Sequence, residues 1–340
     1  MNNRGVPLEP APTVSVIIPT YNRRDSLLRA LDSLQQQTFP MDRLTVVVVD
    51  DGSTDDTQTL ASQQFPFTLC YLQQKNQGAT AARNYGAITS QSEILVFIDD
   101  DMTLSPQTLE TVAEACCKQT KVLVTGTIKK RSNDNVSVYT PVVLTMAAHT
   151  LIARDDVEFH FIDCNTELLV CKRSDFFEIG MFQDPTGGHG WPNWDDVDFG
   201  YRAHLKGFRL IGTSKAIAEH WDHSIADRTK ACQRFYRAGR SAVLLFKRYP
   251  ELQTLIPMLH DKTPLSLRQD SPRLIARKLA RRLASSRPVL ASVVKLVSIL
   301  EKHYPSPVIL RRLYYFLHGA NLFQGYREGL REFKLVGVQE

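Results

Sequence analysis

Three consecutive carboxylates follow directly on a run of apolar residues, and this stretch is the best suited to chemistry. The run is Ile94–Ile98, and the acids are Asp99, Asp100 and Asp101. An uninterrupted apolar run of this length is typical of a strand buried on both faces of a parallel sheet. In an extended chain Asp99 and Asp101 point to one side and Asp100 to the other, which predicts a clamp for Mg2+ or Mn2+. For the triplet alone, a solvated acidic turn is an equal alternative.

A cation in such a clamp implies a particular kind of substrate. Mg2+ and Mn2+ are commonly held by one or two carboxylates together with the phosphate oxygens of a bound substrate. The carboxyl end of a strand in an open α/β sheet is also where ligands bind. The sequence therefore predicts a phosphorylated substrate at this edge.

A second group of acids, Asp195, Asp196 and Asp198, begins a predicted helix and follows a glycine-rich stretch, residues 187–191. The glycines fit a mobile lid over a site. Acids in a first turn also stabilise a helix without any chemistry, and Arg202 stands four residues beyond Asp198. Taken alone, the pattern leaves both interpretations open.

Alternating strand and helix patterns must position these acids. Apolar runs predict strands, and apolar residues at helical spacing predict helices after each of them. Strands are expected at Val14–Pro19, Leu44–Val49, Phe67–Leu72, Val122–Ile128 and Ile211–Ala218, with helices from Asn22 or Asp25, from Asp55 or Asp56, over Asn76–Asn84 and over Leu109–Cys117. The repeat predicts βαβ units, and so an α/β fold with a mostly parallel sheet, flanking helices and right-handed crossovers.

Composition is ordinary for a soluble globular protein, with 43% hydrophobic and 23% charged residues. A length of 340 residues suits one large domain or one and a half. Six cysteines without CxxC spacing predict reduced thiols and a cytoplasmic setting. Residues 1–12 are polar and proline-rich, unlike a secretory signal. No stretch reaches 18 apolar residues, so a spanning helix is not expected.

Positive charge is concentrated in the last part of the chain. Residues 268–340 contain 14 Lys and Arg against 5 Asp and Glu, whereas the whole chain carries a net +5. Helical patterns dominate after residue 228, and Arg273–Leu283 is amphipathic. Such basic helices suit an anionic membrane surface, and packing with solvated arginines explains them equally well. No nucleic-acid-binding module is recognisable, so nucleic acid is not an expected partner.

Four segments in order, VSVIIPTYNR, VVVVDDGSTDDT, NQGATAARNYG and ILVFIDDDM, resemble the nucleotide-binding half of the family 2 glycosyltransferases. The resemblance implies the GT-A fold and an inverting, metal-dependent transfer from a nucleotide-diphosphate sugar to a hydroxyl of a glycan or lipid-linked acceptor. It implies a catalytic domain over 13–228, divided into a nucleotide-binding half (13–102) and an acceptor half (103–228). A flexible start (1–12) and a basic helical region (229–340) would flank it.

The same resemblance implies roles for individual residues. Thr20, Tyr21 and Asp51 would hold the base and ribose, with Asp50 less certain, and Arg83 would lie near the base or phosphates. Asp99 and Asp101 match the metal-binding DxD motif, with Asp100 also beside the nucleotide sugar. His220 fits a third metal ligand better than His223. Mn2+ or Mg2+ is the expected cofactor.

WDDVDFGYR resembles the family's acidic motif beside the acceptor. Asp196 is the expected general base, and Asp195 is the near alternative. Asp198 would contact the acceptor or orient the helix. Trp194 would stack on the acceptor sugar or belong to the core.

Two other functions share this sheet chemistry. A non-catalytic scaffold that binds nucleotide sugars would lack turnover, although the intact acids argue against it. A metal-dependent nucleotidyltransferase would release pyrophosphate instead of a nucleoside diphosphate.

Overall fold

The computed structural model describes residues 11–131, 139, 142, 157–184, 194–221, 227–259, 261–268, 270–303 and 306–333. The chain divides into two compact units. The first comprises 1–130, 150–190 and 195–221, and the second comprises 131–149, 191–194 and 222–340. The predicted lid at 187–191 and His223 lie outside the described residues.

The first unit contains the sheet and the helices beside it. Its strands are β1 (Val14–Thr20), β2 (Leu44–Asp50), β3 (Thr68–Gln73), β4 (Ile94–Phe97), β5 (Met102–Leu104), β6 (Val122–Lys130), β7 (Glu158–Phe159), β8 (Leu169–Lys172) and β9 (Arg209–His220). Its α-helices are α1 (Arg24–Gln35), α2 (Ala79–Thr89), α3 (Thr108–Lys118), α5 (Arg173–Ile179) and α6 (Asp195–Leu205). Short 3-10 helices are η1 (Met41–Arg43), η2 (Asp56–Ser62) and η3 (Phe161–Asp163).

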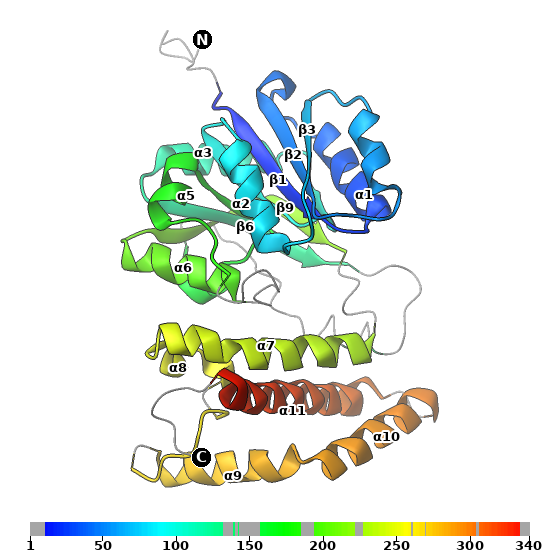
Figure 1. Cartoon of the computed structure of the whole chain (residues 1–340), viewed down its shortest axis with the longest axis vertical. Helices are drawn as coiled ribbons and strands as arrows, with labels where there is room; N and C mark the ends of the chain where they lie inside the picture. The colour runs from blue at the N-terminus through cyan, green and yellow to red at the C-terminus, as the bar shows by residue number, and fades with distance from the viewer. Residues whose placement is uncertain are drawn as a thin grey trace. The chain divides into compact units, whose positions relative to one another are not determined.

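Within the described residues these strands form one sheet, in the order β3-β2-β1-β4-β8-β6-β9-β5, with β7 paired to β9 (Figure 1). β3, β2, β1 and β4 are parallel neighbours, and β6 runs parallel to β9. β8 and β5 are antiparallel to their partners. The expected mostly parallel sheet with flanking helices is confirmed.

Alternate residues of the apolar strands fill two cores, one on each face of the sheet. Val16 and Val96 belong to a cluster with residues of α1 and α3, whereas Ile17 and Phe97 belong to one with residues of α2, α5 and α6. A strand covered on both faces can be apolar at every position. This is why uninterrupted apolar runs predicted these strands correctly.

Two predicted helix starts differ from the structure. Neither Asn22 nor Asp25 caps α1, because Arg23 is its N-cap residue and makes no side-chain cap bond. The segment after Asp55 is capped by that side chain, but it continues as the 3-10 helix η2 and not as an α-helix.

The second unit is helical, as expected for residues 229–340. It contains α7 (Arg228–Arg248), α8 (Leu252–Leu255), η5 (Pro257–Leu259), α9 (Pro272–Ala284), α10 (Arg287–His303) and α11 (Pro307–Phe333). α11 lies along α7 on one side and contacts α10 on the other (Figure 1). A Cβ at Gly239 of α7 would lie 2.0 Å from the Leu322 carbonyl oxygen of α11, so the two backbones touch there.

Among the described residues, no single helix is long and apolar enough to cross a membrane. α9 and α10, bent by 69° at the break between them, meet the length and composition requirement only as a pair.

Close contact between α2 and the sheet gives a stability prediction. A Cβ at Gly86 would lie 2.7 Å from Ile17 Cγ2 and 3.2 Å from Val49 Cγ2. Gly86→Ala gains about 1 kcal/mol of helix propensity, but overpacking costs about 1–3 kcal/mol, so we expect net destabilisation. Amide hydrogen exchange should quicken in α2.

The matched control is Gly319→Ala in α11, where the new methyl group would meet no backbone atom and lie 2.9 Å from Arg281 Nη1, at the end of a long side chain. We expect this variant to slow exchange in α11, because the propensity gain of about 1 kcal/mol is retained. Equal effects of the two substitutions would show that sheet contact at Gly86 is unimportant.

Candidate functional site

Three neighbouring parallel strands, β2, β1 and β4, deliver their carboxyl ends to one edge of the sheet. Thr20 ends β1, and its hydroxyl donates to Asp100 Oδ2 at 2.8 Å. Asn22 accepts from the Thr54 backbone N–H at 2.7 Å, which ties the loop after β1 to the loop after β2. The sequence-predicted acidic residues therefore converge because the parallel register aligns their strands.

The chain turns at the three aspartates. The Met102 N–H donates to the Asp99 carbonyl oxygen at 3.2 Å, which closes a four-residue turn. Arg23 Nη1 then contacts both Asp100 Oδ1 at 3.0 Å and Asp101 Oδ2 at 3.1 Å. The expectation that Asp100 points away from Asp101 is wrong, since it assumed an extended chain.

Arg83 of α2 joins two acidic segments that are distant in the sequence. Its Nη2 lies 2.5 Å from Asp99 Oδ1, and its Nη1 lies 3.3 Å from Asp195 Oδ2. The Arg83 side chain is buried, and Thr80 also donates to Asp195 Oδ2, at 3.0 Å. One guanidinium thus holds the aspartate turn against the start of α6.

The two neighbouring acids at the start of α6 differ in their surroundings. Asp195 is occupied by Thr80 and Arg83, whereas Asp196 Oδ1 accepts from the Val197 N–H at 2.8 Å. Burial, followed by repulsion from Asp195, raises the pKa of Asp196 to about 7. Burial also raises the pKa of Asp100 to about 6 against the attraction of Arg23.

Asp198 is fully buried, so it cannot contact an acceptor. It pairs with Arg202 at 2.7 Å, and that arginine donates to the carbonyl oxygens of Ile179 and Met181. The contacts support the other role considered for Asp198, which is orientation of α6.

Trp194 cannot stack on a sugar as it stands. Its side chain belongs to the second unit, is only 3% exposed and donates through Nε1 to the Ala238 carbonyl oxygen at 2.8 Å. The core interpretation of this residue is therefore correct, because the side chain is buried and bonded to α7.

Strand pairing brings His220 to the aspartate turn. β5 pairs with β9 so that Met102 stands opposite His220, which places His220 Nε2 3.2 Å from Asp101 Oδ1. Its Nδ1 lies 2.9 Å from Glu167 Oε1. Burial lowers the pKa of His220, but hydrogen bonds to Asp101 and Glu167 outweigh it and raise the value to about 10.

Glu167 was not anticipated from the sequence. Lys130 of β6, which is in register with His220 of β9, lies 2.5 Å from Glu167 Oε1. Although burial raises the pKa of Glu167, His220 and Lys130 lower it to about 2. Arg23 was missed as well, although it closes the VSVIIPTYNR segment; for Glu167 the sequence carries no comparable signal.

The donor set fits a divalent cation with few protein ligands. Within the described part of the chain no group of three His, Cys, Asp or Glu side chains is arranged around one metal position. Asp101 and His220 are nevertheless adjacent, and Glu167 orients the imidazole so that Nε2 faces Asp101. A cation that takes its remaining ligands from substrate phosphates requires no more than this.

Asp51 and Tyr21 occupy different positions at this edge. Asp51 is buried and accepts from the backbone N–H groups of Gln77 and Gly78 and from the Gln74 side chain, all within 2.8 Å. It therefore fixes the loop that starts α2. Tyr21 is 45% exposed, so its ring is available to a ligand.

Fold and site together define a class of protein. A mostly parallel sheet with carboxylates gathered at the carboxyl ends of adjacent strands, beside a second acidic helix start, is the arrangement expected of GT-A glycosyltransferases. The comparison with known families agrees: residues 15–166 match the model of glycosyl transferase family 2. This match confirms the expected resemblance to family 2 glycosyltransferases for residues 15–166.

Named relatives match between 29% and 31% of the chain. The glycosyltransferase AglE of Haloferax volcanii is 39% identical over 105 residues, covering 29% of this chain and 34% of the relative. The validoxylamine A glucosyltransferase of Streptomyces hygroscopicus subsp. jinggangensis is 38% identical over 107 residues, covering 31% and 25%. The matched part spans about a third or less of the length of these relatives.

Solved structures extend the likeness to the fold of nearly the whole chain. A mannosyltransferase from Pyrobaculum calidifontis, solved in complex with GDP-Man and Mn2+, superposes with a TM-score of 0.57 at 21% identity, covering 94% of this chain and 88% of the other. TarS of S. aureus superposes at 0.50 with 17% identity, covering 89% and 55%. At such identities the likeness concerns the fold alone.

The raised pKa of Asp196 gives a pH prediction. A carboxyl that holds its proton up to about pH 7 when folded, but only to about 3.8 when unfolded, stabilises the fold at low pH, and that contribution is lost as the pH rises through 7. We expect Asp196→Asn to stabilise the ligand-free protein increasingly from pH 5 to 7 and to level off above. Urea unfolding at each pH measures this, with the exposed Asp42→Asn as control. A difference that stays constant with pH would contradict the burial argument.

Proposed function

We propose that this chain transfers a sugar from a nucleotide-diphosphate sugar to a hydroxyl group of a glycan or lipid-linked acceptor, with inversion at the anomeric carbon. The observation that carries the proposal is the double contact of Arg83 with Asp99 and Asp195. Arg83 joins the aspartate turn, where the donor would bind, to the start of α6, where the acceptor would bind. Donor and acceptor hydroxyl could then meet within the reach of both groups.

Inversion by single displacement needs one proton acceptor at the attacking hydroxyl. Asp196 suits this role better than Asp195, because Arg83 and Thr80 already occupy the Asp195 carboxylate. A pKa near 7 is also close to the ideal for a general base at neutral pH. Asp195 then acts as a positioning residue that anchors the start of α6.

Asp101 and His220 would hold the divalent cation, with Asp99 as the further carboxylate at the same turn. Such a cation neutralises the negative charge that develops on a diphosphate leaving group. The Pyrobaculum structure with GDP-Man and Mn2+, which shares the fold, supports both the class of donor and the kind of metal. Thr20, Tyr21 and Asp51 lie at the strand ends where the nucleotide would bind.

Replacing the proposed base separates binding from chemistry. Asp196→Asn should lower kcat for transfer by about 10²–10⁴-fold, since an amide cannot accept the proton. Donor binding should persist, measured as the thermal shift that a nucleotide sugar with Mn2+ produces. Asp42→Asn, an exposed substitution of the same chemistry, should match the parent in both measurements. Transfer near the parental rate by Asp196→Asn would remove Asp196 from this role.

The released product distinguishes this proposal from its alternatives. Glycosyl transfer releases a nucleoside diphosphate, a nucleotidyltransferase releases pyrophosphate, and a non-catalytic scaffold releases neither. Two incubations with Mn2+ are compared, one with nucleotide sugars and an acceptor glycan, the other with nucleoside triphosphates and a sugar phosphate. Anion-exchange chromatography that resolves nucleoside diphosphates from pyrophosphate identifies the product of each. Pyrophosphate release would replace the proposed activity by nucleotidyl transfer.

Glu167 should tune metal affinity without touching substrate. Glu167→Gln removes the charge that orients His220, and loss of such a supporting contact weakens metal binding about 10–100-fold. Calorimetric titration of Mn2+ in the presence of a nucleoside diphosphate measures the affinity directly. Glu114→Gln, an exposed site on α3, is the matched control. Unchanged affinity in Glu167→Gln would mean that His220 does not bind the cation.

A further inference from the structure

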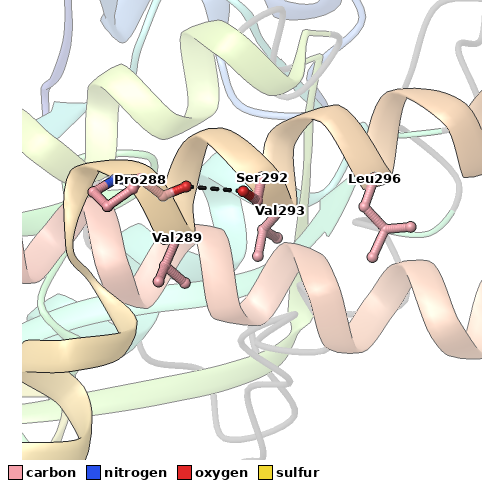
Figure 2. Close-up of a pocket in the computed structure, with 5 residues that line it drawn as sticks. All are labelled: Pro288, Val289, Ser292, Val293 and Leu296. Atoms are coloured by element: carbon pink, nitrogen blue, oxygen red, sulfur yellow. Dashed lines mark hydrogen bonds between the residues drawn. The ribbon is translucent and has the colours of Figure 1, made fainter.

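The second unit exposes an apolar stripe on α10, of which Val293 also packs against the core of the unit. On α10, Val289, Ser292, Val293 and Leu296 line one side together with Pro288 and form an open groove of about 330 Å³ (Figure 2). These positions recur at three- and four-residue intervals, so they share one helix face. Ile299 continues the stripe and is 45% exposed.

α9 adds to this apolar surface. Leu279 and Leu283, four residues apart, are 49% and 74% exposed, although the buried face of α9 is anchored elsewhere. Lys278 pairs with Asp270 at 2.7 Å, and Arg281 pairs with Asp261 at 2.6 Å. Ion pairs therefore hold α9 in place, while its leucines face outward. We call the exposed residues of α9, α10 and the start of α11 the outer surface.

Positive charge surrounds these apolar side chains, and negative charge is almost absent. Between residues 271 and 316 the sequence has ten Lys and Arg but a single acid, Glu301. That carboxylate is half-buried and is bonded to Tyr314 and Arg228. The exposed cations of the outer surface are Arg273, Arg277, Arg282, Arg287, Lys295, Lys302, Arg311 and Arg312.

We propose that the outer surface docks on an anionic lipid bilayer, with the leucine and valine side chains inserted at the headgroup boundary and the cations among the lipid phosphates. Apolar side chains interleaved with Lys and Arg are the pattern of helices that lie in such an interface. Each cation near the surface contributes through attraction to anionic lipid. A nucleic-acid partner would use the charges but would leave the exposed leucines in water.

This docking goes beyond the proposed sugar transfer and does not depend on it. It requires only that the second unit presents the outer surface to lipid, so binding can be measured without donor, metal or acceptor. If transfer is real, docking would concentrate the enzyme where lipid-linked acceptors reside. Vesicle binding tests docking and sugar transfer tests the enzymatic activity, so a negative result in one measurement does not decide the other.

The test uses the full chain and vesicles of phosphatidylcholine alone or with 30% phosphatidylglycerol, separated by flotation. We expect binding to the anionic vesicles, weak binding to the neutral ones, and loss of binding as NaCl rises from 0.1 to 0.5 M. Equal binding to both vesicle types, or binding that ignores salt, would overturn the proposal.

Two double variants locate the surface. Arg282→Gln with Lys295→Gln should weaken anionic-vesicle binding about 30-fold, since each charge contributes roughly fivefold. Leu283→Ser with Leu296→Ser should weaken it at least about tenfold by removing inserted apolar area. All four side chains are exposed, so circular dichroism and Tm should stay at the parental values.

The matched control is Lys247→Gln with Lys215→Gln, which removes two exposed charges outside the outer surface, one on α7 and one in the first unit. It should bind anionic vesicles within about twofold of the parent. If the control loses binding as strongly as Arg282→Gln with Lys295→Gln, attraction depends on total charge and the outer surface is not the docking site.

A second copy of this chain could cover the outer surface in place of lipid. Light scattering tests this by measuring the molar mass of the parent and of Leu283→Ser with Leu296→Ser. The proposal expects the same molar mass for both. A parent dimer that becomes a monomer in Leu283→Ser with Leu296→Ser, with vesicle binding unchanged, would make the outer surface a contact between copies and overturn lipid docking.

Discussion

The site depends on one buried guanidinium that holds two carboxylates from separate segments. Arg83 reaches Asp99 with one terminal nitrogen and Asp195 with the other, and its side chain is only 7% exposed. A buried cation between two acids is stable only while both remain, because each would otherwise be left desolvated and unpaired. The arrangement therefore fixes the distance between the aspartate turn and α6 more rigidly than loop packing would. Everything proposed for donor and acceptor relies on that fixed separation.

The buried carboxylates at the carboxyl ends of the strands also explain why several basic side chains lie within the site. Burial makes ionised carboxylates costly, as the raised pKa values of Asp100 and Asp196 show. Arg23 and Arg83 offset this cost at the aspartate turn, while Lys130 and His220 do so at Glu167. Within the part of the chain that the structure describes, Asp196 accepts a hydrogen bond from the Val197 N–H alone, and burial followed by repulsion from Asp195 raises its pKa to about 7. Asp195 and Asp196 therefore differ because Asp195 contacts Thr80 and Arg83, whereas Asp196 contacts the Val197 N–H.

Sequence reasoning located the strands and the acids, because both follow local rules. Apolar runs mark doubly covered strands, and parallel strands bring their carboxyl ends to one edge, so Asp51, Asp99 and Thr20 were correctly placed together. The direction of the three aspartates was wrong, since a single turn after β4 depends on a hydrogen bond from Met102 that no local pattern reveals. For Trp194 and Asp198 a role at the acceptor and a packing role both stayed open, because exposure cannot be read from one sequence. Glu167 escaped notice because it lies just before β8, and only the folded sheet brings it to Lys130 of β6 and His220 of β9.

In the second unit, glycines let α7 and α11 pack closely, while apolar side chains on α9 and α10 stay exposed to solvent. At Gly239 and Gly325 a Cβ would lie within 2.0 Å of a carbonyl oxygen of the facing helix, so α7 and α11 approach to backbone contact. Their interface buries Phe246 and Tyr326, and a separate cluster joins α10 to α11 through Val297. The helices therefore gain their cohesion from their inward faces and from exposed pairs such as Arg240 with Glu332. Leu283 and Leu296 on α9 and α10 remain 74% and 46% exposed, so much of their apolar surface is in contact with water. Burying that surface against lipid would add a hydrophobic contribution that folding does not supply.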